Sequence, residues 1–151
     1  MLTAATLGVG LLVGGVIFNV TGCKLSDKAD EAWAQMEKAE KTIHAICSYL
    51  KQLKSAAEEY TRSLVTVRDK YEEFFGYISY GVDNLHKTDW NDFTDEEKIA
   101  TQNAVLLVGL LYKMCQVSLV NKAANDQDMN TVNTNAITDS IRNANSVLSH
   151  L

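Results

Sequence analysis

An apolar stripe from Trp33 to Ile78 is the feature that most constrains what this chain can fold into. Its members recur mostly in alternating steps of three and four residues, which places them on one face of a helix. The chain contains no proline, the residue that most often interrupts a helix. The spacing therefore predicts one helix over about 26–80, roughly 80 Å long. The stripe comprises Trp33, Met36, Ile43, Ile46, Leu50, Leu53, Ala57, Tyr60, Leu64, Val67, Tyr71, Phe74 and Ile78.

Local signals indicate where this helix begins and ends. Ser26 offers a capping hydroxyl, and Asp27 follows it in the first turn, where the helix dipole favours acids. Gly76 and Gly81 weaken the carboxyl-terminal end, because glycine has a low helix propensity. A helix with one apolar face cannot stand alone in water, so we expect further helices to cover the stripe.

Two further helices are predicted after a turn at about 84–93. Thr94 and Glu97 form the pattern of a capping box, which begins a helix over about 95–121. A polar linker then leads to a last amphipathic helix over about 132–151. No alternating pattern in the chain predicts a strand.

The expected fold class is all-α: an elongated antiparallel helical bundle over 24–151, built on one long helix of ~50 residues. The uncharged stretch from Ile99 to Tyr112 is 14 residues long. This length is short for a membrane span and typical of a buried core helix, so we expect the stretch to be buried. A membrane hairpin that forms under particular conditions stays open as an alternative.

The first 23 residues form a separate segment that has no charged side chain. They reach the length of about 20 apolar residues that spans a bilayer as a helix. Small residues recur on one helical face every seven residues, at Gly8, Gly15 and Gly22. Two small pairs lie four residues apart: Ala4 with Gly8, and Gly10 with Gly14. Small residues at this spacing let helices approach closely in lipid.

The segment over 1–23 resembles the glycine-zipper segments of bacterial membrane proteins, which implies a helix that meets lipid and copies of itself. Two alternatives stay open. Val20-Thr21-Gly22-Cys23 resembles a bacterial lipobox, in which Cys23 becomes the lipidated first residue after cleavage, although no Lys or Arg precedes the apolar run. The segment could also be a buried central helix of a soluble bundle, against which its five glycines count.

An acidic segment over 83–97 carries the chain's whole net charge, since six acids and one base sum to −5 there. We name this segment the acidic tip, and it is a candidate surface for a basic protein partner. Nucleic-acid binding is not expected, because the chain has no basic stripe. The candidate partner-facing residues are Asp83, Asp89, Trp90, Asp92 and Asp95.

No pattern in the chain predicts catalysis, a cofactor or a metal site. The sequence lacks a phosphate-binding loop, a Gly-x-Ser-x-Gly turn and a His-Glu-x-x-His motif. Glu40, His44 and Cys47 share a helix face, and Cys115 or His150 could complete a tetrahedral zinc site with them, but we expect His44 to be partly exposed and Cys47 to belong to the core. We expect Cys47 and Cys115 to be small buried hydrophobes, and their pairing stays open. The chain is therefore not expected to be an enzyme.

Two functions are compatible with these patterns. The first is a membrane-associated structural or interaction protein of the cell envelope, whose partners are the lipid bilayer and copies of itself. The second is a secreted, membrane-inserting effector. The elongated bundle with a concealed apolar element resembles the architecture of helical pore-forming toxins, and this resemblance implies insertion through the first segment. A lipoprotein with Cys23 at its mature amino terminus is a further alternative to the first function.

Overall fold

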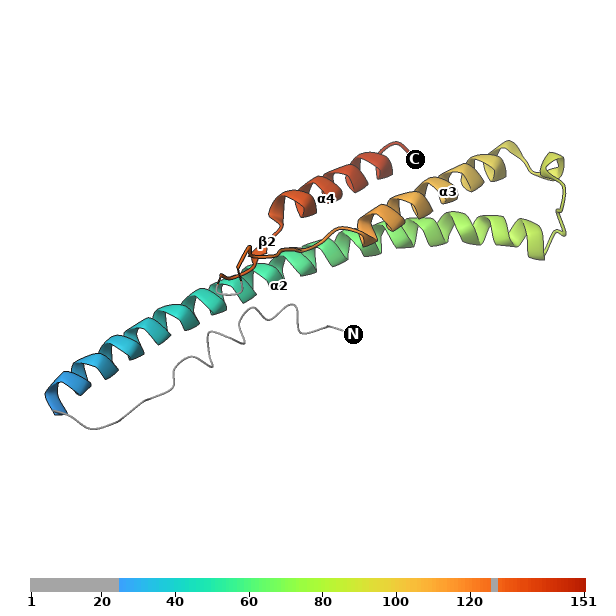
Figure 1. Cartoon of the computed structure of the whole chain (residues 1–151). Coiled ribbons are helices and arrows are strands. Elements are labelled where there is room, and N and C mark those ends of the chain that lie inside the picture. Colours follow the sequence, from blue (N-terminus) through green and yellow to red (C-terminus); the bar gives the residue numbers. More distant parts are fainter. Residues whose placement is uncertain (1–24, 126–127) are drawn as a thin grey trace. The chain divides into compact units, whose positions relative to one another are not determined.

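The structure, a computed structural model, describes residues 25–125 and 128–151 of the chain. Within this part the chain is mostly helical, as predicted, with one short pair of strands (Figure 1). The predictions for Ala4, Gly8, Gly10, Gly14, Gly15, Gly22 and Cys23 lie outside the described residues. The elements in chain order are α2 (Leu25–Asp83), η2 (Trp90–Asp92), α3 (Asp95–Cys115), β1 (Val120–Asn121), β2 (Thr131–Val132) and α4 (Thr134–Leu148).

The predicted long helix is confirmed as α2, which has 59 residues and continues through both glycines to Asp83. The chain then leaves the helix in a tight turn. The amide of Leu85 donates to the carbonyl of Tyr80 (3.4 Å), and the amide of Lys87 donates to that of Gly81 (3.2 Å). His86, three residues after the end of α2, takes the left-handed conformation with φ of 52°.

The next helix, α3, is shorter than the sequence predicts, because it ends at Cys115 rather than near residue 121. The amide of Val117 donates to the carbonyl of Met114 (3.1 Å), which closes the last turn. The chain then extends, and Val120 pairs with Val132 in a two-stranded antiparallel ladder. β-Branched residues fit such a ladder, but the partner strand lies too far along the chain for local spacing to reveal it.

The last helix also begins later than predicted, since Thr131–Val132 belongs to β2 and α4 runs over Thr134–Leu148. A hydrogen bond joins the two ends of the loop between the strands: the amide of Ala123 donates to Oδ1 of Asn130 (2.9 Å). This loop corresponds to the predicted polar linker. Asn130 and Asn125 stabilise the loop from within, since Asn125 also donates to the carboxylate of Asp128 (3.2 Å).

The chain divides into two units, one made of residues 1–55 and 120–133 and the other of 56–119 and 134–151. Most buried apolar side chains belong to the second unit. Those of Val67, Leu107 and Met114 are almost fully enclosed. In the described part of the first unit, the buried apolar side chains are Ile46 and Tyr49.

Within the second unit, α3 runs antiparallel to the 56–83 part of α2 (Figure 1). The hydroxyl of Tyr60 donates to the carbonyl of Met114 (2.7 Å) at one end, and Gly81 lies beside Glu97 at the other. The same hydroxyl lies 3.0 Å from Oγ of Ser140 on α4. The buried residues of α3 recur every three or four positions, as a helix packed on one face requires: Glu97, Ala100, Ala104, Leu107, Leu110 and Met114.

Two expectations about burial are wrong. Cys47 and Cys115 are both exposed and free rather than buried. Each directly follows a buried residue, Ile46 and Met114, and therefore points about 100° away from the covered face. The apolar stripe of α2 is also only partly buried, since Trp33 stays 70% exposed. Its buried members are Ile46, Tyr60 and Val67, whereas Met36, Ile43 and Leu50 are exposed like Trp33.

Candidate interaction surfaces

An ion pair between Lys87 and Glu97 organises the acidic tip. Lys87 Nζ lies 2.8 and 2.6 Å from the two carboxylate oxygens of Glu97. The Glu97 side chain is almost enclosed, and that of Lys87 is mostly so. The same carboxylate accepts a hydrogen bond from the amide of Thr94 (2.7 Å), and the Thr94 hydroxyl accepts one from the amide of Glu97 (3.3 Å). The predicted capping box is therefore confirmed.

These donors hold the pKa of Glu97 below its usual range, first through the Lys87 ammonium and then through the Thr94 amide. Burial acts in the opposite direction. Gly81 makes room for this arrangement, because a Cβ there would lie 3.1 Å from Oε1 of Glu97. The sequence reveals Glu97 as a cap but not Lys87 as its partner, since the two residues meet only through the turn.

Trp90 and Asp89 have local structural roles. Asp89 caps the short helix η2, where its carboxylate accepts from the amide (2.8 Å) and side-chain nitrogen (2.9 Å) of Asn91. The Trp90 and Phe93 rings stack within the turn, with centroids 5.7 Å apart. Lys98 Nζ lies 5.9 Å from the Trp90 ring centroid. Trp90 nevertheless remains 49% exposed and can reach a partner.

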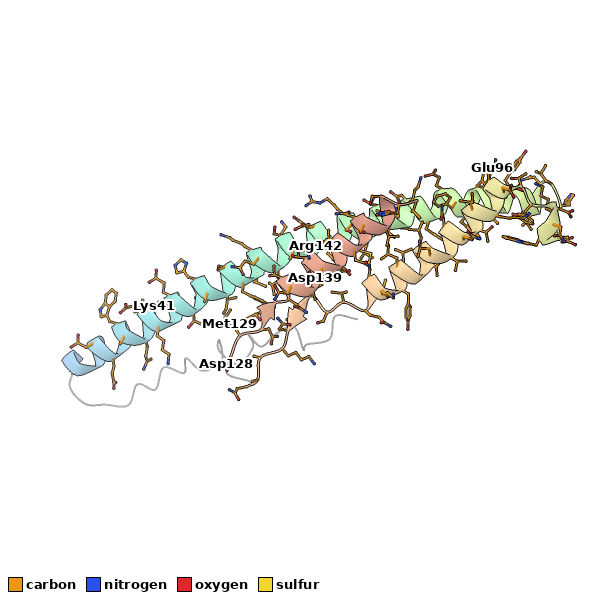
Figure 2. All side chains as sticks on the ribbon, turned by 90° about the horizontal axis from the view of Figure 1, so that it is seen from above. Lys41, Glu96, Asp128, Met129, Asp139 and Arg142 are labelled. Carbon is orange, nitrogen blue, oxygen red and sulfur yellow. The ribbon has the colours of Figure 1, made fainter. Side chains whose placement is uncertain are left out.

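The remaining acids of the tip face solvent. Asp83, Asp92 and Asp95 are exposed. Asp95 lies in the first turn of α3, where the helix dipole favours a negative charge. Glu96, next to it at the amino end of α3 (Figure 2), has a lowered pKa because of hydrogen bonds from its own amide and from the Thr94 side chain. The structure thus gathers the predicted acids at one turn, but helix capping explains part of the cluster.

An apolar surface that the sequence does not predict lies on α3. We name it the α3 apolar face. Only one side of the uncharged stretch is buried, so the prediction of a fully buried helix is wrong. Val105 is 69% exposed and Tyr112 is 66% exposed. Gly109 lies between them, and a Cβ added there would meet nothing within 4 Å. The members are Ile99, Val105, Leu106, Val108 and Tyr112.

A second exposed apolar surface lies on the first half of α2. We name it the α2 seam, and it consists of Trp33, Met36, Ile43 and Leu50. Charged residues flank it, including Lys41 (Figure 2), which pairs with Glu37 at 2.7 Å. Exposed apolar patches of this kind on a protein commonly mark interaction surfaces. The sequence predicts that these residues share one helix face, but it does not predict that they stay exposed.

Other kinds of site are not found in the part of the chain that the structure describes. There, no three His, Cys, Asp or Glu side chains are grouped so that they could hold a metal ion. Glu40 and His44 do approach, with Oε1 and Nε2 3.6 Å apart, and both are exposed. None of the described helices combines the length and apolar character needed to cross a membrane.

Comparison with known proteins adds no assignment. No protein family model, no curated protein and no solved structure matches this chain significantly. The molecule offers three candidate interaction surfaces: the acidic tip, the α3 apolar face and the α2 seam. Two of the three are apolar, and exposed apolar patches commonly mark interaction surfaces.

Proposed function

We propose that the protein is a membrane-associated helical interaction protein that self-associates, with its first 23 residues as the lipid-facing segment. Its helices would form an elongated antiparallel bundle that presents the acidic tip to a basic protein partner. One observation carries the proposal: α2 and α3 leave large apolar side chains exposed on two separate faces. An uncharged, glycine-containing segment next to such helices supports contact with lipid and with further copies.

Vesicle flotation tests the lipid contact. The full chain should float with liposomes of phosphatidylcholine and phosphatidylglycerol. The double variant Leu11→Asp, Ile17→Asp should stay at the bottom of the gradient, because charges are costly in hydrocarbon. Asp92→Asn in the exposed tip is the matched control and should float like the parent chain. Flotation of the double variant would contradict the proposed lipid contact.

A membrane-inserting effector is the second candidate, and the α3 apolar face favours it. This face places uncharged side chains where a partner or a bilayer can reach them. An effector of this kind should release dye from liposomes, whereas an anchored scaffold should bind without release. Gly8→Leu with Gly15→Leu should abolish release, because the bulky side chains block close helix contact. Val108→Glu should also abolish release, whereas Glu72→Gln on the exposed side of α2 should not.

The lipoprotein alternative makes a separate prediction. If Val20 to Cys23 acts as a lipobox, the mature protein begins at a lipidated Cys23. Mass spectrometry of the amino terminus from membranes decides between this form and a chain that retains the first segment. Cys23→Ser should abolish membrane attachment if the lipid on Cys23 is the anchor. It should leave attachment intact if the first segment itself is the anchor.

A further inference from the structure

The α2 seam has the spacing of a coiled-coil interface. Trp33, Met36, Ile43 and Leu50 fall on positions that alternate by three and four residues, together with Glu40 and Cys47. Alternation of this kind averages 3.5 residues, the repeat with which two helices wind around each other. Ile43 is 56% exposed, and Cys47 is also exposed. The seam is therefore an interface without a partner in the described residues.

The packing that buries other parts of α2 does not cover the seam. The buried residues of the same region are Ile46 and Tyr49. Ile46 lies three residues after the seam position Ile43, which corresponds to a rotation of about 60° around the helix, and Tyr49 lies three residues after Ile46. α2 thus carries two adjacent apolar lines here, of which one is covered and the other is open.

The identity of the missing partner follows from the register of the sequence. The three glycines of the first segment recur every seven residues, and the same step continues without interruption into the seam. The series of heptad positions is Gly8, Gly15, Gly22, Ala29, Met36, Ile43 and Leu50. A glycine repeat in an uncharged segment favours close contact between identical helices. A partner that contacts both the glycine repeat and the α2 seam must share this heptad register. A second, parallel copy of the chain meets that requirement.

The length of the seam supports the same conclusion. From Trp33 to Leu50 it spans about 27 Å of helix, which is less than the three to four heptads that a coiled coil usually needs. Together with the glycine repeat, the shared register extends over six heptad steps, from Gly8 to Leu50. Glu40 is the one charged residue among the seam positions from Trp33 to Leu50. Its apposition to Glu40 of a parallel copy weakens the contact, because the two carboxylates repel each other.

We infer that the α2 seam is a parallel, in-register interface between two copies of this chain, continuous with the glycine repeat of the first segment. This inference rests on the proposed self-association at the membrane, for which it names the residues. In such a dimer the two Cys47 side chains lie opposite each other, whereas in an antiparallel pair they do not. Ile43 and Leu50 likewise meet their own counterparts.

Cysteine cross-linking of the full chain in neutral detergent micelles tests this geometry. One variant retains Cys47 (Cys23→Ser, Cys115→Ser), and the control retains Cys115, which is also exposed (Cys23→Ser, Cys47→Ser). Oxygen with copper phenanthroline accepts two electrons and two protons from each pair of thiols, which form one disulfide. The Cys47 variant should cross-link to a dimer at least ten times faster than the control. Equal rates, or no dimer from Cys47, would overturn the inference.

Non-covalent association gives a second measurement. In sedimentation equilibrium, Ile43→Asp should raise the dimer Kd at least tenfold, and Glu40→Leu should lower it at least tenfold. Val65→Asp, at an exposed apolar position of α2 outside the seam, should leave the Kd unchanged. Circular dichroism confirms that each variant retains its helix content. An unchanged Kd for both Ile43→Asp and Glu40→Leu would overturn the inference even if the Cys47 variant cross-links.

Flotation of the same variants separates this inference from the proposed function. If the Cys47 variant cross-links in detergent and Ile43→Asp and Glu40→Leu shift the dimer Kd as expected, but the parent chain does not float, the seam interface stands and the proposed lipid contact fails. If the parent chain floats but neither cross-linking nor sedimentation detects a dimer, the seam interface fails and the lipid contact stands.

Discussion

Two tyrosines of α2 show how the setting of a single residue decides what its hydroxyl contributes. Tyr60 is buried, and its hydroxyl has partners on α3 and α4. Tyr49 is also buried, but its hydroxyl has no hydrogen-bond partner among the described residues. Burial accordingly raises the pKa of Tyr49. A buried hydroxyl without a partner costs desolvation energy that a partner would offset.

We therefore expect opposite outcomes from the same substitution. Tyr60→Phe should lower the free energy of unfolding by about 1 kcal/mol, because it removes a satisfied hydrogen bond. Tyr49→Phe should leave stability unchanged or increase it. Urea denaturation followed by circular dichroism measures both, with the exposed Tyr77→Phe as the control. Equal losses for Tyr60→Phe and Tyr49→Phe would contradict the assigned hydrogen bonds.

The lowered pKa of Glu97 predicts a dependence of stability on pH. A carboxyl whose folded pKa is depressed stabilises the fold above its unfolded pKa of roughly 4.3, and this contribution is lost as pH falls through the folded value. Glu97→Gln should therefore lower Tm most at neutral pH, and the difference in Tm from the parent chain should become smaller below about pH 4.

The control for this prediction is Lys87→Met, because Lys87 is the first cause of the lowered pKa. This variant should reduce Tm at neutral pH and should reduce the further effect of Glu97→Gln, since the two residues act through one contact. A Tm difference for Glu97→Gln that stays constant from neutral to acidic pH would show that the ion pair is not responsible.

The two glycines near the end of α2, Gly76 and Gly81, differ in the space that surrounds them. A Cβ on Gly76 would meet nothing within 4 Å, whereas one on Gly81 would lie close to the Glu97 carboxylate. That carboxylate is held by Lys87 and by the Thr94 amide and has little freedom to move. Local helix propensity treats both glycines alike, so only the packed turn distinguishes them.

Alanine substitution should separate these two positions. Gly76→Ala should stabilise the protein by about 0.5–1 kcal/mol, because alanine loses less entropy in a helix. Gly81→Ala should gain clearly less, since the added methyl group presses on Glu97. Thermal unfolding of the two variants beside the parent chain provides the measurement. A gain at Gly81 as large as that at Gly76 would argue against the close packing.

At the scale of the elements, the sequence predicts best where local signals agree. The spacing of the stripe yields α2, and the Thr94 capping box yields the start of α3 at the correct residue. The end of α3 and the start of α4 are predicted less well, because Val120 and Val132 pair across eleven intervening residues. The candidate acids are brought together by the turn, but the role of Lys87 depends on a contact that spacing does not encode.

Burial is unevenly distributed over the whole molecule. Most enclosed apolar side chains belong to the unit made of 56–119 and 134–151, including Val67 and Leu107. In the first half of α2, by contrast, Trp33 and Ile43 are exposed. Helices with few buried apolar contacts open more readily, because their hydrogen bonds depend on propensity rather than on packing.

Hydrogen exchange should follow this distribution. At low protein concentration, amides in 60–80 and 100–114 should exchange at least tenfold more slowly than those in 30–43. Raising the concentration should slow exchange in 33–50 selectively, because dimerisation through the α2 seam adds burial there. Mass spectrometry of peptic peptides reports both effects. Uniform exchange along α2 at every concentration would contradict the uneven burial.

The sequence by itself determined that this chain is helical, that one helix is very long, and where the turn at the acidic tip begins. These properties follow from spacing, capping residues and the absence of proline, all of which act over a few neighbouring residues. The tertiary structure decided which apolar residues are covered. It buried Leu107 but left Val105 exposed, and it buried Ile46 but left Ile43 exposed. Coverage depends on which other helix faces each side, and residues far apart in the chain supply that contact.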